Sequence, residues 1–143
     1  MVFHIKNIET DTKMNENFRK VINTSNNLQL VLMSLKPGED IGMEVHDNID
    51  QFFRIEKGIG VAIIKKETGN EELILSDGSV IIIPKGTYHN IKNTGNESMK
   101  LYSIYSPPNH SPNRIDLNKP KEDSHGGYYQ KYLKYKLKYL KSK

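Results

Sequence analysis

The chain has 143 residues with 36% hydrophobic side chains, which is enough for one domain with a buried core. It contains no cysteine and no apolar run long enough to span a membrane, so disulfides, thiolate metal sites and a transmembrane helix are excluded and an intracellular, soluble protein is expected. The net charge of +4 is uneven, because residues 128–143 carry six lysines and no acid and the remainder sums to −2, so no nucleic acid is expected as a partner of the body of the chain.

Most of the chain before residue 106 has the pattern of short β-strands. One helical turn is expected within 10–18, and strand-like segments at 2–8 and 17–24 precede the main body. The main strands are expected at 27–35, 51–58, 61–66, 72–76, 79–84 and 99–106, separated by glycine-containing turns. Since no long amphipathic helix interrupts these strands, the fold class is all-β, either a sandwich or a closed barrel.

After residue 106 the composition changes. We expect a barrel domain over 1–115, a linker rich in proline and polar residues over 116–127, and a tail over 128–143. In the tail, tyrosines and leucines recur at helical spacing and lysines gather on the opposite side. Three interpretations of the tail stay open: contact with a partner or with its own barrel, an amphipathic helix on an anionic surface, or a disordered end, because isolated helices this short are marginal in water.

The stretch GMEVHDNIDQ contains a glutamate and a histidine two residues apart, Glu44 and His46. Alternate residues of a β-strand point to the same side, so these two side chains are expected to lie together. Taken alone, the stretch is typical of a solvated outer face opposite apolar residues. It is also typical of half of a metal site.

A second stretch, DGSVIIIPKGTYHNIKNTG, runs from residue 77 to residue 95. Its spaced residues are Gly78, Pro84, Gly86, His89 and Asn93. This spacing resembles the second motif of the cupin superfamily without a gap. The first cupin motif also fits from Gly38 to Gly58, except that Glu44 stands where a histidine is usual and Gln51 where a glutamate is usual.

The resemblance covers residues 27–106 and is strongest to small single-domain bacterial cupins with a Glu-x-His pattern followed by glutamine. It implies a double-stranded antiparallel β-barrel, or jelly roll, with metal ligands in its mouth. It also implies a homodimer in which the segment 2–8 crosses to the partner. The tail resembles Tyr/Lys/Leu-rich tails of giant-virus proteins, which implies a location in a host cytoplasm or a virion.

The four residues that the resemblance places at the metal are Glu44, His46, Gln51 and His89. Two imidazoles and one carboxylate are the set of an Fe(II) facial triad, and Mn, Zn and Ni also accept such ligands. Gln51 adds only a neutral amide oxygen, which is a weaker ligand.

Four further residues are expected to line the pocket beside the metal. Phe53 and Ile55 share the strand face of Gln51 and are expected to form an apolar wall. Tyr102 and Ile104 on the last strand are expected to face the cavity.

Two classes of function remain for such a site. The first is a metal-dependent enzyme, either an oxygenase of a small organic acid or phenol or an isomerase or epimerase of a sugar derivative. The second is a module that binds a small ligand without turnover. Because the sequence reveals no acid or base beyond the metal ligands, redox chemistry or no chemistry is favoured over isomerisation.

Overall fold

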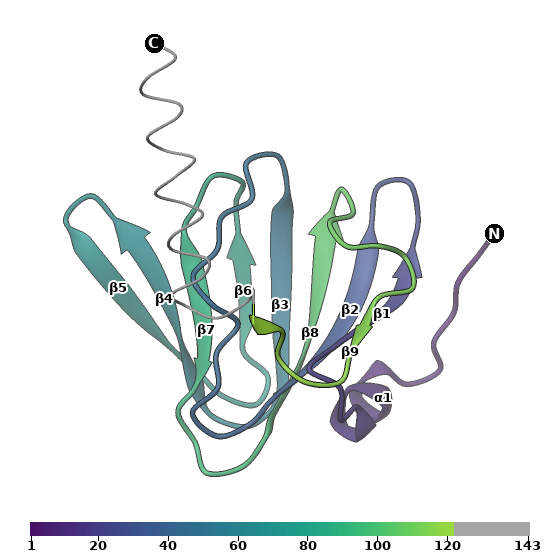
Figure 1. The fold of residues 1–143 in the computed structure, drawn as a ribbon, viewed down its shortest axis with the longest axis horizontal. Helices are drawn as coiled ribbons and strands as arrows, with labels where there is room; N and C mark the ends of the chain where they lie inside the picture. The colour runs from purple at the N-terminus through teal and green to yellow at the C-terminus, as the bar shows by residue number, and fades with distance from the viewer. Residues whose placement is uncertain (122–143) are drawn as a thin grey trace.

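The computed structural model describes residues 1–121 (Figure 1). The described elements in chain order are α1 (Ile8–Met14), β1 (Arg19–Thr24), β2 (Gln29–Leu35), β3 (Asp50–Lys57), β4 (Gly60–Lys66), β5 (Gly69–Leu75), β6 (Val80–Ile83), β7 (His89–Asn93), β8 (Met99–Ser106) and β9 (Ile115–Asp116). Each of the six main strands expected from the sequence is found within three residues of its expected ends. The all-β prediction is confirmed, and the predicted tail over 128–143 lies outside the described residues.

The strands form two antiparallel sheets. The six-stranded sheet has the order β6-β3-β8-β2-β1-β9, and the three-stranded sheet has the order β5-β4-β7. Strands far apart in sequence are neighbours, since β8 lies between β2 and β3. This crossing order is that of the predicted jelly-roll barrel, and Figure 1 shows α1 near the start of β1.

The core lies between the two sheets. Strands β3 and β8 alternate as half-buried strands do, and their inward side chains include the fully buried Phe53, Ile55, Met99 and Leu101. Each such side chain contributes about 1.5–3 kcal/mol when it leaves water, so this face fixes the register of the two strands.

The helix α1 begins at Ile8, earlier than the helical turn expected within 10–18. The side chain of Asn7 caps it by accepting a hydrogen bond of 3.0 Å from the backbone nitrogen of Thr10. The segment 2–8, expected to be strand-like, forms no strand within the described chain: residues 2–7 are irregular, and Ile8 begins α1. Figure 1 shows the N-terminus running clear of the barrel.

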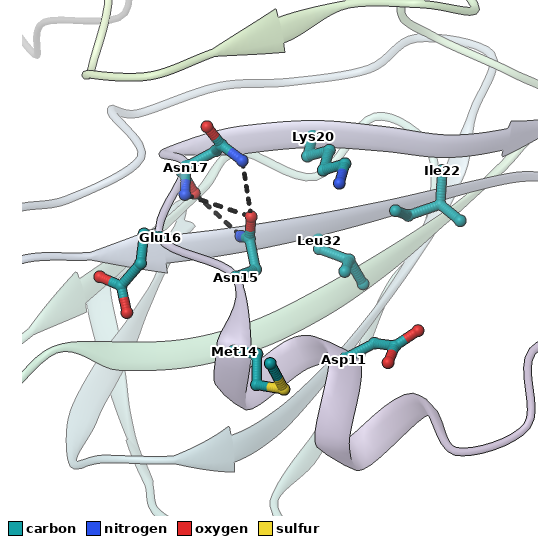
Figure 2. Close-up of a pocket in the computed structure, with 8 residues that line it drawn as sticks. All are labelled: Asp11, Met14, Asn15, Glu16, Asn17, Lys20, Ile22 and Leu32. Atoms are coloured by element: carbon teal, nitrogen blue, oxygen red, sulfur yellow. Dashed lines mark hydrogen bonds between the residues drawn. The ribbon is translucent and has the colours of Figure 1, made fainter.

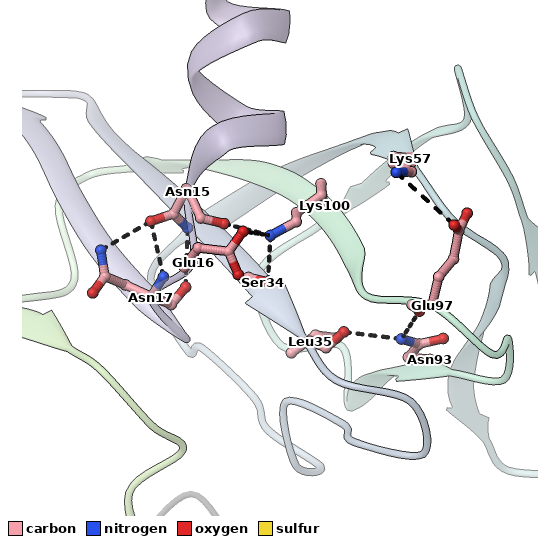
Figure 3. Close-up of polar contacts among 9 residues, drawn as sticks. All are labelled: Asn15, Glu16, Asn17, Ser34, Leu35, Lys57, Asn93, Glu97 and Lys100. Carbon is pink, nitrogen blue, oxygen red and sulfur yellow. Dashed lines mark hydrogen bonds and ion pairs between the residues drawn. The ribbon is translucent and has the colours of Figure 1, made fainter.

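The segment after α1 is anchored by a buried lysine on β8 (Figure 3). Lys100 is 5% exposed, and its ammonium group donates to the carbonyl of Asn15 at 2.6 Å and to the hydroxyl of Ser34 at 3.0 Å. Its charge is offset by Glu16, whose carboxylate lies 3.3 Å away.

The asparagine of the second motif also has a structural role, which Figure 3 shows. The amide nitrogen of Asn93 donates to the carbonyls of Leu35 at 2.9 Å and Glu97 at 2.8 Å. Its oxygen accepts from the backbone nitrogen of Gly95 at 2.9 Å. The side chain therefore ties the turn after β7 to the end of β2.

The C-terminal part of the described chain is held to the barrel beyond residue 115. Asp116 in β9 pairs with Arg19 in β1 through a contact of 2.5 Å, and Lys119 forms an ion pair with Asp40. The first residues of the expected linker thus pack on the barrel. None of the helices within residues 1–121 has the length and apolar character needed to cross a membrane.

Candidate metal centre

The two motifs are joined by a short backbone pairing. The backbone nitrogen of Glu44 donates to the carbonyl of His89 at 2.8 Å, and the nitrogen of His89 donates to the carbonyl of Glu44 at 2.9 Å. The nitrogen of Gly86 donates to the carbonyl of His46 at 2.8 Å. Gly86 has a φ of 80°, a conformation that side chains disfavour, so glycine at this motif position permits the turn that holds the two segments together.

This pairing brings three side chains to one point. The carboxylate oxygen of Glu44 lies 3.4 Å from Nε2 of His89 and 3.6 Å from Nε2 of His46. One ligand atom from each of the three residues lies within 4.8 Å of the others. The residues predicted from the two motifs are therefore adjacent in space, as a shared ion requires.

Gln51 of β3 completes the group. Its side-chain oxygen lies 3.1 Å from Nε2 of His89, while its nitrogen donates to the hydroxyl of Ser103 at 2.9 Å. Gln51 is 1% exposed, so both contacts are made away from water. Ser103 thus turns the amide so that its oxygen faces the site.

The hydrogen-bond partners of the histidines leave lone pairs pointing at one another. Nδ1 of His89 lies 2.9 Å from the carbonyl of Thr87, which only accepts, so Nδ1 carries the proton and Nε2 of the neutral ring holds a lone pair. That lone pair faces the oxygens of Glu44 and Gln51. Nε2 of His46 is buried and has no hydrogen-bond partner among residues 1–121.

With both rings neutral, the group presents only acceptors, which a bound cation would satisfy; a proton on either imidazole, shared with Glu44, is the alternative. Two imidazole nitrogens and one carboxylate oxygen fit a divalent first-row metal, and a hydrogen bond such as that from Nδ1 of His89 to the carbonyl of Thr87 usually orients a metal-binding ring. The structure therefore suggests a metal here without specifying its identity.

The carboxylate of Glu44 stays ionised at neutral pH and in moderate acid. Burial raises the pKa of Glu44, but the interactions with His46 and His89 outweigh burial and lower the pKa from 4.5 to about 2. A negatively charged oxygen is thus available to a cation at neutral pH.

A tyrosine that the sequence analysis did not select lies beside the triad. Tyr105 of β8 is 3% exposed, and the edge of its ring faces the ring of His46 at 5.7 Å between centroids. Burial raises the pKa of Tyr105 above its usual value, and the nearby charge of Glu44 raises it further, so the hydroxyl keeps its proton.

His110, in the loop after β8, contacts this tyrosine. Nε2 of His110 lies 3.2 Å from the hydroxyl of Tyr105, and Nδ1 lies 3.4 Å from the guanidinium of Arg114. The guanidinium, a donor, faces Nδ1, and the amide nitrogen of Asn109, also a donor, lies 3.4 Å from Nε2, so the direction of the hydrogen bond between Nε2 and the Tyr105 hydroxyl follows the tautomer of the ring. Burial and the charges of Arg19 and Arg114 lower the pKa of His110 from 6.5 to about 4, which keeps the ring neutral.

The prediction that Tyr102 and Ile104 face the cavity is corrected by the strand pairing. Tyr105 lies opposite Gln51, while Ile104 lies opposite Phe52 on the outer face of the sheet. Tyr102 stacks on Phe52 there, with 6.1 Å between ring centroids. Neighbouring residues of a strand point to opposite faces of the sheet. The expectation is therefore wrong by one position along β8: Tyr102 and Ile104 lie on the outer face, and Tyr105 lies on the inner face.

The two expected wall residues on β3 do share the face of Gln51. Phe53 is fully buried, and its ring centroid lies 6.0 Å from that of His89, so it contacts the site. Ile55 is also fully buried but lies two residues further along β3, opposite Leu101 in the core.

A jelly-roll barrel with two histidines and a carboxylate converging at its mouth defines the class of cupins. Residues 31–105 match the cupin-domain family, and the chain belongs to it.

Several relatives extend this match beyond the family domain. The chain is 44% identical to an uncharacterised protein of Acanthamoeba polyphaga mimivirus over 96% of its own length and 89% of that protein, which confirms the resemblance to giant-virus proteins. It is 49% identical to the uncharacterised protein YrkC of Bacillus subtilis over 74% of its length, and spans 58% of that longer protein.

Solved structures agree on the fold. A crystal structure from Bacillus halodurans is 42% identical with a TM-score of 0.78, over 81% of this chain and 89% of that one. The structure of KdgF from Halomonas is 21% identical with a TM-score of 0.57, over 64% of this chain and 78% of that one, so this second likeness concerns the fold alone.

Proposed function

We propose that the chain binds one divalent first-row metal through Glu44, His46 and His89 and acts as a metal-dependent oxygenase on a small organic molecule. The observation that carries the proposal is the convergence of these three ligand atoms within 4.8 Å, with Nε2 of His46 buried and unpartnered within residues 1–121.

The ligand set favours a site that remains open to substrate. Three protein ligands leave coordination positions free, and two imidazoles with one carboxylate are the set of the Fe(II) oxygenases. Gln51 is better suited to orient His89 than to bind strongly, because its amide is neutral and its nitrogen is held by Ser103. When bound, the metal would supply the redox or Lewis-acid chemistry, and Phe53 would exclude water from one side.

A second candidate is an isomerase or epimerase. The specific observation in its favour is the hydrogen-bonded pair of Tyr105 and His110 beside the triad. Burial and the charge of Glu44 raise the pKa of Tyr105, so its hydroxyl keeps its proton and can donate a hydrogen bond to a molecule held in the mouth. A non-catalytic ligand-binding module is the third outcome, in which metal and ligand bind without turnover.

Metal analysis of full-length protein purified without chelator tests the site. We expect about one metal ion per chain, lost in His46→Ala and in His89→Ala because each removes one of three strong ligands. Gln51→Ala should retain the metal with weaker affinity. His110→Ala is the matched control, since its ring is not among the ligand atoms, and it should keep full occupancy.

Turnover assays then separate the candidate functions. Oxygen consumption with small acids and phenols that depends on the bound metal would support the oxygenase. Sugar isomerisation that is lost in Tyr105→Phe with metal retained would favour the second candidate instead. Full-length protein without metal whose variants all behave alike would contradict the proposal. The intracellular location and the tail contact with an anionic surface stay predictions.

A further inference from the structure

A buried glutamine on β2 fastens the loop that follows β8. Gln29 is fully buried, and its side-chain oxygen accepts hydrogen bonds from the backbone nitrogens of Asn109 at 3.0 Å and His110 at 2.8 Å. Its side-chain nitrogen donates to the carbonyl of His110 at 2.7 Å and to the hydroxyl of Thr24 at 2.9 Å. An amide accepts two hydrogen bonds and donates two, so the side chain is fully satisfied and most of its bonds hold the loop.

The fastened loop brings His110 to the side chain of Tyr105. Nε2 of His110 lies 3.2 Å from the tyrosine hydroxyl, and the two rings meet edge to face at 5.2 Å between centroids. Gln29 on β2 and Gln51 on β3 are the cross-strand neighbours of Tyr105. Since cross-strand neighbours point to the same face of a sheet, the three side chains form one buried row that leads from the loop to the candidate metal centre.

The far end of this row contacts the candidate ligands. The ring of Tyr105 faces that of His46, and the oxygen of Gln51 lies 3.1 Å from Nε2 of His89. Burial raises the pKa of Tyr105, and the charge of Glu44 raises it further, so the hydroxyl keeps its proton. A hydroxyl has one proton and two lone pairs, so its bond to His110 leaves it able to bond a second group.

We propose that the loop 107–114 forms one wall of the mouth and that Gln29 and His110 are positioning residues, which hold the hydroxyl of Tyr105 against an oxygen of a small carboxylate ligand. This inference rests on the proposed metal site. A divalent ion held by one carboxylate and two neutral imidazoles keeps a net positive charge, which attracts an anion. A hydroxyl that keeps its proton beside this charge fits an anion with acceptor oxygens.

A separate groove offers anions a competing site, which Figure 2 shows. It lies between α1 and the six-stranded sheet, has a volume of about 490 Å³, and includes Lys20 of β1 in its lining. No residue of the loop 107–114 lines this groove. An anion bound there would not depend on Gln29 or His110, so Lys20→Met is the control for the anion measurements.

Amide hydrogen exchange of the metal-free, full-length chain tests the fastening. Gln29→Met removes the hydrogen bonds but keeps a side chain of similar size. The backbone amides of Asn109 and His110 should then exchange at least about tenfold faster, because their acceptor is lost. The matched control is Ser25→Ala in the turn before β2, whose hydroxyl bonds the carbonyl of Leu28 and not the loop, and it should leave both rates unchanged.

Acetate titration of the cobalt(II)-loaded chain, followed by the visible absorption of the metal, tests the positioning. Tyr105→Phe and His110→Ala should each raise the Kd for acetate by about three- to tenfold, the range that one hydrogen bond contributes. Gln29→Met should raise the Kd by a similar factor with the cobalt content unchanged. His110→Ala keeps the backbone bonds to Gln29, so it tests the ring separately from the fastening. Lys20→Met should leave the Kd unchanged.

The double variant Gln29→Met/Tyr105→Phe separates positioning from a general loss of structure. Its Kd should equal that of Tyr105→Phe alone, because Gln29 acts on the ligand through the tyrosine hydroxyl. Additive losses overturn the positioning role, and so does a Kd that Tyr105→Phe leaves unchanged or that responds to Lys20→Met instead of His110→Ala. Unchanged amide exchange in Gln29→Met overturns the fastening. A chain that takes up no cobalt contradicts the proposed function and the carboxylate contact with it, whereas the exchange rates of the metal-free chain decide the fastening by themselves.

Discussion

At the scale of single residues, the site depends on how each polar atom is satisfied. The carbonyl of Thr87 sets the tautomer of His89, and Ser103 sets the orientation of Gln51. Neither contact adds a ligand, but the first turns Nε2 of His89 toward the carboxylate of Glu44, and the second turns the oxygen of Gln51 toward Nε2 of His89. The cupin motif specifies the residue types at the candidate site, and these outer contacts decide which atom of His89 and of Gln51 faces it.

The neutral, partly buried His110 predicts a pH-dependent stability. Its pKa falls from 6.5 to about 4 on folding, so the unfolded chain takes up this proton at a higher pH than the folded chain. Acidification from about pH 6.5 to about pH 4 therefore favours unfolding. The full shift corresponds to about 3 kcal/mol, and solvent screening reduces the expected loss to roughly 1–2 kcal/mol.

Urea titrations between pH 7 and pH 4 measure this loss. His110→Gln should lose less stability over the interval than the wild type, because glutamine does not titrate. His4→Gln is the control, since His4 is exposed in the irregular segment before α1, and it should follow the wild type. Equal acid sensitivity of His110→Gln and the wild type would show that other groups govern the transition.

At the scale of elements, the barrel is closed by contacts between segments distant in sequence. Strand β8 lies at the centre of the six-stranded sheet, with Tyr105 beside the site and Lys100 beneath the segment that follows α1. The same strand thus positions a side chain at the mouth and anchors the N-terminal part of the chain at the other end. Its inner and outer faces serve separate purposes, because its side chains alternate.

The burial of Lys100 predicts that its substitution lowers the free energy of unfolding far more than substitution of Lys57, which lies opposite it on β3. Lys100→Met leaves the carbonyl of Asn15 and the hydroxyl of Ser34 without their donor, which should lower the free energy of unfolding by about 1–3 kcal/mol. Lys57, its cross-strand neighbour on β3, has a half-exposed side chain 3.9 Å from the carboxylate of Glu97.

Urea unfolding of Lys100→Met and of the control Lys57→Met tests this difference. An exposed pair of this kind contributes little, so Lys57→Met should change the free energy of unfolding by less than about 0.5 kcal/mol. Metal content should be the same in both variants, because neither lysine approaches the triad. Equal stability of the two variants would mean that water replaces the contacts of Lys100.

At the scale of the whole molecule, the site, the sheet face and the tail are separate parts. The proposed ligands lie at the barrel mouth between residues 44 and 89, and the apolar side chains of Ile82, Phe52 and Ile104 lie on the outer face of the six-stranded sheet. Residues 126–143 contain six of the lysines and no acidic residue, so they dominate the net charge without contributing a proposed ligand.

Deletion of residues 126–143 is therefore expected to leave the metal content and the melting temperature nearly unchanged. It lowers the formal net charge from +4 to −2 and should remove salt-sensitive binding to anionic vesicles or DNA, because that attraction is electrostatic. A melting curve, a metal assay and retention tests at two salt concentrations measure these effects. A large drop in melting temperature would mean that the tyrosine and leucine face of the tail packs on the barrel.

The sequence by itself determined the fold class, most of the strands and the residues at the candidate site, but it missed β7 and β9 and expected a strand over 2–8 that does not form in the described chain. Strand patterns are local, and the two motifs specify His46 and His89 by residue type and spacing alone. The face of β8 was decided only by the tertiary structure, because the side to which Tyr102 or Tyr105 points depends on pairing with β3. The contact between Tyr105 and His110 also arises only on folding, since it depends on the path of the loop after β8. The burial of Lys100 under Asn15 depends on a partner 85 positions away in the chain. No local pattern encodes such contacts, because hydrophobic burial fixes them once the sheets have packed.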